Sequence, residues 1–364
     1  MERYDDLPLT DCHVHMRGDM VSVENLHGVM DACGYDAMAL MCIALRDDRG
    51  LKTSLLGLLF KALYPGKVYA FGGLRHPESG DVPDARPYAE QARHLVEMGC
   101  DGIKLIEGKP TIRKMLGRPL DDPRYDDFYS YLEEESVPVL FHVADPESFW
   151  DPELAPPSAH ERGWFYGDGT FTGKEELYAE VESVLAKHPN LRVVFAHFYF
   201  LSADLDRLER FLADHPNASI DITPGSEMYA DFSAQVDRAR DFFIDHADRI
   251  LFGTDIMGGW SPDPGLGQRE KARVADMRRF LESDDEFGWW GHELHGIALP
   301  REDLAAIYAG NFRRWAGERP QPVHMPDVLA ECGRLEDLTR DAGLSEIAHD
   351  LVEIRERFEG LAAR

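Results

Sequence analysis

The sequence predicts an α/β protein whose main part is a (β/α)8 TIM barrel, followed by a helical C-terminal extension. Along the first 316 residues, eight short apolar segments of strand character alternate with helical segments. Such alternation is typical of parallel βαβ units, and eight of them can close a barrel. A doubly wound open sheet is the competing fold. No GxGxxG fingerprint follows the first strand, however, and the sequence contains no P-loop.

The predicted strands share an apolar run of four to ten residues that ends at a polar residue or at Gly or Pro. They cover residues 7–15, 35–44, 67–74, 101–107, 137–143, 191–197, 218–223 and 249–254.

The predicted helices fill the intervals between these strands, and several end at Gly or at a Pro-Gly pair. They cover residues 23–34, 51–64, 87–99, 123–136, 175–187, 205–213 and 236–246, then a helix that ends near 281 and a closing helix at 301–316.

Two stretches depart from this alternation. Residues 144–173 form a long insertion after the fifth strand that is rich in Pro and Gly and contains Trp150 and Trp164. Long loops in compact domains are usually functional, and the aromatic residues favour an ordered lid. Residues 317–364 form the helical extension, so the expected organisation is a barrel over 1–316 with a lid and a C-terminal appendage.

The composition excludes several classes of protein. The formal net charge of −28 repels nucleic acid and anionic membranes. No apolar run approaches the roughly 18 residues that a membrane span needs. The N-terminus lacks the basic head and apolar stretch of a signal peptide, and the five cysteines form no CxxC pair. We therefore expect a cytoplasmic enzyme or binding protein for a small molecule, and the residues leave a homo-oligomer open.

Polar residues at the ends of the predicted strands indicate a functional site. His13 and His15 are separated by one residue, so on a strand their side chains lie on the same face. His142 ends the fifth strand, His197 the sixth and Asp255 the eighth. Active sites of barrels lie at the C-terminal ends of the strands, and this set would lie at one level there. Any one of these residues alone could be structural, but together they predict a metal site.

This arrangement resembles the amidohydrolase superfamily, and in particular its amidohydrolase-related branch. That branch includes aminocarboxymuconate semialdehyde decarboxylase, resorcylate-type decarboxylases and dicarboxylate lactonases. The similar segments are HPNLRVVFAH at 188–197, RILFGTD at 249–255 and LPREDLAAIYAGNF at 299–312. The likeness covers residues 8–316.

The resemblance implies a ligand set of His13, His15, His142 and Asp255, with Asp255 also acting as a proton acceptor. His197 would be an acid/base and carbonyl-polarising group in single-metal members, or a ligand of a second metal. Three imidazoles and a carboxylate suit Zn²⁺, with Mn²⁺ as the alternative. The metal would lower the pKa of a bound water towards neutrality.

The fourth strand leaves the number of metals open. Two-metal members of the superfamily often have a bridging lysine or glutamate there, and this chain has Lys104 and Glu107. The two residues have opposite parity, so without a bulge only one faces inward. Glu107 lies at the strand end and is the better-placed candidate ligand, although a loop-facing salt bridge would explain it equally well.

Basic residues near the predicted site suggest an anionic substrate. Arg46 and Arg75 follow the second and third strands, and arginine suits bidentate carboxylate binding. Tyr199 and Trp164 could line an apolar part of the pocket. Alternatively, the two arginines pair with nearby acids such as Asp48, and the tryptophan packs within the lid.

The segment 292–295, His-Glu-Leu-His, is not the HExxH motif of zinc proteases, because its histidines are three residues apart. We predict a surface loop there.

Three functions remain open at this point. The first is a metal-dependent hydrolase of a lactone or amide, and the second is a non-oxidative decarboxylase that uses the same ligands. The third is a metal-free binding barrel, against which the complete set of strand-end residues argues.

Overall fold

The computed structural model describes residues 4–45, 48–82, 84, 86–225, 227–258 and 265–363. The chain forms two compact units whose segments alternate along the sequence. Unit 1 comprises Met1–Leu7, Leu105–Gly253 and Ala275–Asn311, and unit 2 comprises Pro8–Lys104, Thr254–Val274 and Phe312–Arg364.

Unit 2 contains a parallel sheet in the order β4-β3-β2-β1-β9, of which β4 belongs to both units. All six residues of β1 and of β3 are buried, as expected of strands covered on both faces. The strands are β1 (Thr10–His15), β2 (Ala37–Cys42), β3 (Val68–Gly73), β4 (Gly102–Gly108) and β9 (Ile256–Met257).

The helices of unit 2 follow its strands. They are α1 (Val21–Cys33), a 3₁₀ turn at Asp48–Lys52, α2 (Thr53–Leu63), α3 (Tyr88–Glu97), the start of α11 (Gln268–Glu282), α13 (Asn311–Ala316), α14 (Met325–Asp341) and α15 (Ser345–Ala362).

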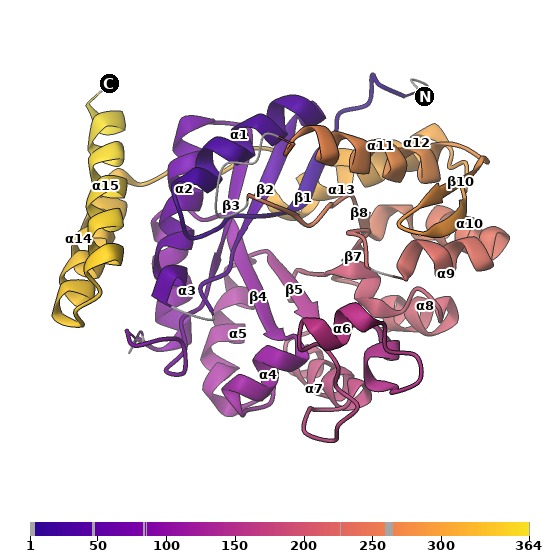
Figure 1. Ribbon diagram of the computed structural model, residues 1–364, viewed down its shortest axis with the longest axis horizontal. Coiled ribbons are helices and arrows are strands. Elements are labelled where there is room, and N and C mark those ends of the chain that lie inside the picture. The colour runs from indigo at the N-terminus through magenta and orange to yellow at the C-terminus, as the bar shows by residue number, and fades with distance from the viewer. Residues whose placement is uncertain are drawn as a thin grey trace. The chain divides into compact units, whose positions relative to one another are not determined.

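The predicted C-terminal extension is a pair of long helices, and α14 and α15 lie side by side (Figure 1). Helix α15 packs against α2, whose residues from Thr53 to Lys61 are all buried. A helix that is buried all round must be covered by other elements on each side. The C-terminal pair supplies that cover, and the buried Lys52 forms an ion pair with Asp350 of α15.

Unit 1 contains the other parallel strands, in the order β8-β7-β6-β5-β4. They are β5 (Val139–Val143), β6 (Val193–Phe195), β7 (Ala218–Asp221) and β8 (Ile250–Leu251). The pairings β5–β6, β6–β7 and β7–β8 all run parallel.

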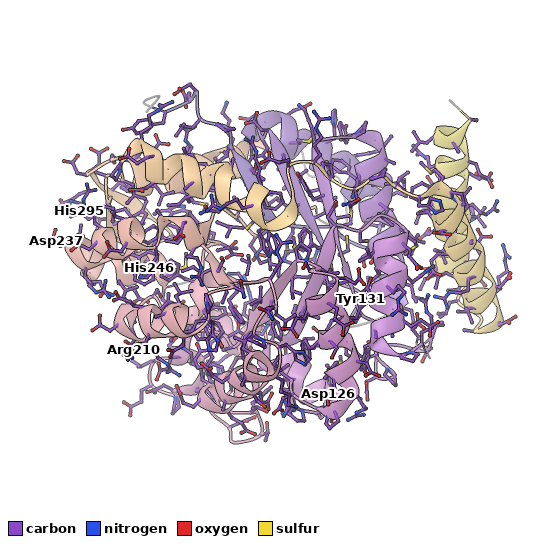
Figure 2. All side chains as sticks on the ribbon, turned by 180° about the vertical axis from the view of Figure 1, so that it is seen from behind. Asp126, Tyr131, Arg210, Asp237, His246 and His295 are labelled. Atoms are coloured by element: carbon purple, nitrogen blue, oxygen red, sulfur yellow. The ribbon has the colours of Figure 1, made fainter. Side chains whose placement is uncertain are left out.

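Helices surround these strands, and Figure 2 shows Asp126, Arg210 and Asp237 on three of them, towards the margins of unit 1. They are α4 (Pro110–Leu116), α5 (Asp126–Glu134), α6 (Pro157–Glu161), α7 (Lys174–Lys187), α8 (Leu205–Asp214), α9 (Met228–Ala234), α10 (Val236–Asp245), the end of α11 and α12 (Arg301–Ala305). Short 3₁₀ turns occupy Pro123–Tyr125, Glu147–Trp150, His197–Phe200 and Ala247–Arg249.

The fold class is as predicted, an α/β fold of the TIM-barrel type with C-terminal helices, and all eight predicted strands are present. Among the described residues, no helix has the length and apolar character needed to cross a membrane.

Three details differ from the prediction. The segment 292–295 is not a loop but strand β11 (His292–His295), which forms an antiparallel hairpin with β10 (Glu286–Trp289). Its Leu294 is buried, and the backbone N–H of His295 donates to Ser233 Oγ at 3.0 Å. The predicted closing helix at 301–316 is interrupted by a π-helical turn at Ala306–Gly310. The predicted eighth strand, residues 249–254, is shortened to the two residues of β8 (Ile250–Leu251).

Candidate active site

The histidine pair of β1 lies at the centre of a cluster in unit 2. His13 is fully buried and His15 nearly so, and their ring centroids are 5.0 Å apart. The pairing of β1 with β2 has an irregularity between Asp11 and Val14. Both imidazoles nevertheless approach the same carboxylate, with Nε2 of His15 2.9 Å and Nε2 of His13 3.9 Å from Asp255 Oδ1. The prediction that the two histidines share a face is confirmed.

Asp255 reaches this pair through an unusual backbone conformation. Its φ is 57°, in the left-handed region that residues other than glycine rarely adopt. Its backbone N–H donates to the carbonyl of His13 at 2.8 Å, which ties the loop after β8 to β1. The structure therefore orients the Asp255 side chain by a local bond to the strand that carries the two histidines.

Asp11 is a buried carboxylate that the sequence interpretation missed. It accepts hydrogen bonds from the backbone N–H of His13 at 3.0 Å, the backbone N–H of Thr254 at 3.2 Å and Thr254 Oγ1 at 2.5 Å. Burial raises the pKa of Asp11 to about 6, although these bonds oppose the rise. The carboxylate thus joins β1 to the residue before Asp255. Its position two residues before the His pair was the available signal.

The fourth strand places a lysine beside the His pair. Nζ of the buried Lys104 lies 3.2 Å from Nε2 of His13. Burial lowers the pKa of His15, the Asp255 carboxylate opposes that shift, and the Lys104 ammonium adds to it. Glu107 belongs to unit 1, where its Oε2 accepts the backbone N–H of Ile106 at 2.7 Å. Sequence reasoning favoured Glu107 over Lys104, yet Lys104 is the residue observed beside a predicted ligand.

Unit 1 brings together the other two histidines. The rings of His142, in β5, and His197, after β6, have centroids 5.0 Å apart and meet edge to face. Burial lowers the pKa of His142 well below its usual value, and the nearby Lys109 ammonium lowers it further. His142 is therefore neutral at physiological pH, which is the form that can ligate a metal.

His197 begins a strained turn. Four consecutive residues, His197–Phe200, have φ between 50° and 56°. The turn is held because the backbone N–H of His197 donates to Asp221 Oδ1 at 2.8 Å. Nδ1 of His197 lies 3.2 Å from the carbonyl of Thr223, an acceptor that places the proton on Nδ1. Nε2 of His197 is then the nitrogen with the lone pair.

The two arginines predicted to bind substrate are Arg75 and Arg46. Arg75 is buried, and its guanidinium donates to Ala44 O at 2.9 Å and to Val82 O at 2.7 Å and bonds Asp48 Oδ1 at 3.3 Å. These bonds connect the loops after β2 and β3, and the contact with Asp48 is the one named in the alternative interpretation of this arginine. Arg46 lies outside the described residues.

The two aromatic candidates also differ. Tyr199 is buried, and its ring lies 4.3 Å from that of Phe195 and 4.8 Å from that of Phe211, centroid to centroid. Its ring packs between β6 and α8, within the core of unit 1. Trp164 is half-buried in the 144–173 insertion, with Nζ of Lys109 4.6 Å from its ring centroid.

The donor set of unit 2 fits a divalent metal. One ligand atom from each of His13, His15 and Asp255 lies within 4.8 Å of the others. Zinc bonds to imidazole nitrogen and carboxylate oxygen are about 2.0–2.2 Å long, so two ligand atoms on one ion lie roughly 3–4 Å apart. The observed separations of 2.9 and 3.9 Å to Asp255 are close to that range. The cluster can therefore hold a metal with little rearrangement.

The sequence profile of the amidohydrolase family matches residues 74–315. The chain therefore belongs to the amidohydrolase family. The matched segment contains His142, His197 and Asp255 but begins after the His pair of β1. A search of curated proteins found no significant match.

Several solved structures share the fold of this chain. An uncharacterized TIM-barrel protein from Bordetella bronchiseptica is 14% identical with a TM-score of 0.51, and the alignment covers 86% of this chain and 99% of that one. The IDCase of Metarhizium anisopliae is 16% identical with a TM-score of 0.51, covering 81% of this chain and 79% of that one. A protein described as amidohydrolase II is 13% identical with a TM-score of 0.52, covering 85% and 99%. At these identities the likeness shows the fold alone.

Proposed function

We propose that the protein is a metal-dependent hydrolase that acts on a small carbonyl substrate, a lactone or an amide. The observation that carries this proposal is the cluster of His13, His15 and Asp255 in unit 2. Membership of the amidohydrolase family supports it.

The metal would be held by His13, His15 and Asp255, and the family resemblance adds His142 as a fourth ligand. Zn²⁺ is the first choice and Mn²⁺ the alternative. When bound, such an ion polarises a carbonyl group and lowers the pKa of water towards neutrality. All three imidazole ligands are buried, which limits competition from bulk water.

Asp255 and His197 would have separate roles in the reaction. The Asp255 side chain is 29% exposed, so its carboxylate can accept the proton of an attacking water. His197 presents Nε2, because its Nδ1 faces the carbonyl of Thr223. In this proposal Asp255 passes the proton that it takes from water on to the leaving group, and His197 polarises the substrate carbonyl in its doubly protonated form, in which Nε2 also carries a proton.

An anionic substrate is the finer part of the proposal. Arg75 no longer supports it, because its guanidinium is bonded within the protein. The support now comes from the ammonium of Lys104 next to His13, which places a buried cation beside the predicted metal ligands. A substrate carboxylate could bind there.

The same lysine favours a second candidate, a non-oxidative decarboxylase of an unsaturated or aromatic acid. In that reaction the ammonium would hold the carboxylate, and His197 or Asp255 would deliver a proton to carbon. The two candidates are separated by incubation with lactones and amides on one side and with such acids on the other, measuring ring opening or amine release against CO₂ release.

The test of the metal site uses His13→Ala and Asp255→Ala. Each removes one ligand of the cluster, so bound zinc after dialysis should fall by at least about tenfold and activity should be lost. The metal is measured by elemental analysis of the purified protein. His27→Ala is the matched control, because His27 is an exposed histidine of α1. Full zinc occupancy in both cluster variants would contradict the proposal.

A further inference from the structure

We propose that Asp145 is a positioning residue that orients His142 and links this histidine to the 144–173 insertion. The inference rests on the proposed function, since it treats His142 as a metal ligand. Asp145 is the second residue after β5, and all the residues involved lie in unit 1.

The geometry around His142 defines which ring nitrogen faces a metal. Nε2 of His142 lies 3.0 Å from the carbonyl oxygen of Ala144 and 3.3 Å from Oδ1 of Asp145. Both partners are acceptors, so Nε2 carries the proton and Nδ1 keeps its lone pair. A ligating histidine whose other nitrogen donates to a carboxylate or carbonyl has its ring orientation and tautomer held in place.

The backbone is bent to make this contact. Ala144 has a φ of 64°, a left-handed conformation that costs about 1–3 kcal/mol in a residue other than glycine. The bend is held by the backbone N–H of Ala144, which donates to Gly108 O at 3.0 Å. As a result, the Ala144 carbonyl and the Asp145 carboxylate both face back towards His142.

Two further groups hold the Asp145 carboxylate. Nζ of Lys109 lies 2.7 Å from Oδ1 and 2.5 Å from Oδ2, and the Tyr166 hydroxyl donates to Oδ2 at 2.5 Å. Asp145 is 3% exposed, Lys109 5% and Tyr166 1%. The Asp145 carboxylate is therefore held in place by a buried ammonium and a buried hydroxyl.

Tyr166 connects this group to the rest of the insertion. Its ring belongs to a small core with Phe149 and Ala159, against which Trp150, Trp164 and Phe171 pack. The same Lys109 that binds Asp145 lies over the Trp164 ring. This packing of the insertion places the Tyr166 hydroxyl within hydrogen-bonding distance of Asp145. The packing of the insertion and the orientation of His142 thus depend on one carboxylate.

A buried ion pair seldom adds stability, because removing both charges from water costs more than their attraction returns. We infer that the Lys109–Asp145 pair serves instead to hold the carboxylate that orients His142. A charged acceptor on Nε2 raises the basicity of the imidazole, and removal of such an outer partner typically weakens metal binding about 10–100-fold.

The first experiment tests the hydrogen bond without any metal. In the metal-free, ¹⁵N-labelled protein at pH 8, the ring shifts of His142 should report a proton on Nε2 and none on Nδ1. The assignment uses His142→Gln to identify the signals. A His142 ring protonated on Nδ1 would overturn the inference.

The second experiment measures zinc affinity by competition with a chelating dye. Asp145→Asn should weaken binding about 10–100-fold, and Tyr166→Phe should weaken it by a smaller factor because the carboxylate remains. Tyr129→Phe is the matched control and should bind zinc like the wild type. Its hydroxyl also makes a buried bond, to the carbonyl of Leu120, away from His142.

A double variant covers the case in which Asp145→Asn fails to fold. Lys109→Met combined with Asp145→Asn removes both charges of the pair, and its zinc affinity should fall as in the single variant. Affinity within twofold of wild type in either variant would overturn the role of Asp145. If the wild type itself binds no zinc, the proposed function is overturned, and the NMR measurement still decides the hydrogen bond separately.

Discussion

Three residues at predicted strand ends share a strained backbone. Ala144, His197 and Asp255 have φ values of 64°, 56° and 57°. Each such conformation costs about 1–3 kcal/mol and persists only where surrounding bonds enforce it. In each case the backbone N–H is bonded, to Gly108 O, to Asp221 Oδ1 and to His13 O respectively. Strain of this kind clusters at functional sites, and two of these three residues, His197 and Asp255, are predicted catalytic or metal-ligating residues.

At the residue scale we predict that His197→Asn keeps its metal and loses turnover. Asparagine cannot act as an acid or base near neutral pH, so kcat should fall at least about 100-fold while zinc content stays at one per chain. The measurement is the zinc-to-protein ratio together with kcat on the best lactone or amide found. His215→Asn is the control, because His215, the residue after α8, pairs with Glu182 of α7. Loss of a second metal ion in His197→Asn would instead indicate a two-metal site.

At the scale of elements, the C-terminal helices are attached by a cluster of charges. Glu331 of α14 accepts from Arg334 at 2.6 and 2.7 Å and lies 3.1 Å from Nε2 of His94 in α3. Arg86, in the loop before α3, approaches it at 3.4 Å. Burial raises the pKa of Glu331, but the Arg334 and His94 bonds outweigh it and hold the pKa at about 2. The carboxylate thus helps to attach α14 to unit 2.

We predict that Glu331→Gln lowers the free energy of unfolding at pH 7 by about 1–3 kcal/mol. A carboxyl group whose pKa is depressed on folding contributes stability above its unfolded pKa and loses it at lower pH. The difference in the free energy of unfolding between wild type and variant should therefore be constant above about pH 5. It should decrease towards zero as the pH falls from about 4.5 to 2. Urea unfolding at several pH values measures it.

The control is Glu353→Gln in the same helical pair. Its carboxylate forms an exposed pair with Arg357, which is worth roughly 0.5 kcal/mol or less. A Glu331→Gln effect no larger than that of the control would show that the buried cluster does not hold α14.

At the scale of the whole molecule, the acidic excess opposes folding. The chain has 67 acidic and 39 basic residues, a net charge of −28. Self-repulsion of this size destabilises the compact state and is screened by salt, with a Debye length of about 10 Å at 0.1 M. We predict that Tm at pH 8 rises by several degrees between 20 mM and 0.5 M NaCl, by roughly 2–8 °C.

The internal control is the same comparison near pH 5, close to the isoelectric point of about 4.8. The net charge is small there, so the salt effect should shrink to a fraction of its value at pH 8. Differential scanning calorimetry at both pH values measures the two shifts. Equal shifts would show that salt acts through something other than net charge.

The sequence by itself determined the order of the elements and most of the candidate site. Apolar runs and helical periodicity are local properties, so each predicted strand corresponds to an observed one, β1 to β8 in order. The period-two spacing of His13 and His15 likewise required only strand geometry. The prediction failed where tertiary packing decides the structure, as at β11. Its Leu294 is buried by a hairpin for which the neighbouring sequence carries no local signal.

Only the tertiary structure decided the partners of the buried charges. Whether Arg75 meets a substrate or Asp48, and whether Lys104 or Glu107 faces His13, depends on which distant segments come within about 3 Å of each other. The same holds for Asp145, whose partners Lys109 and Tyr166 come 36 and 21 residues away along the chain. The strained conformations of Ala144 and Asp255 exist only because bonds from other strands enforce them. The sequence can place a group at the end of a strand, whereas the orientation and charge state of that group follow from its neighbours in space.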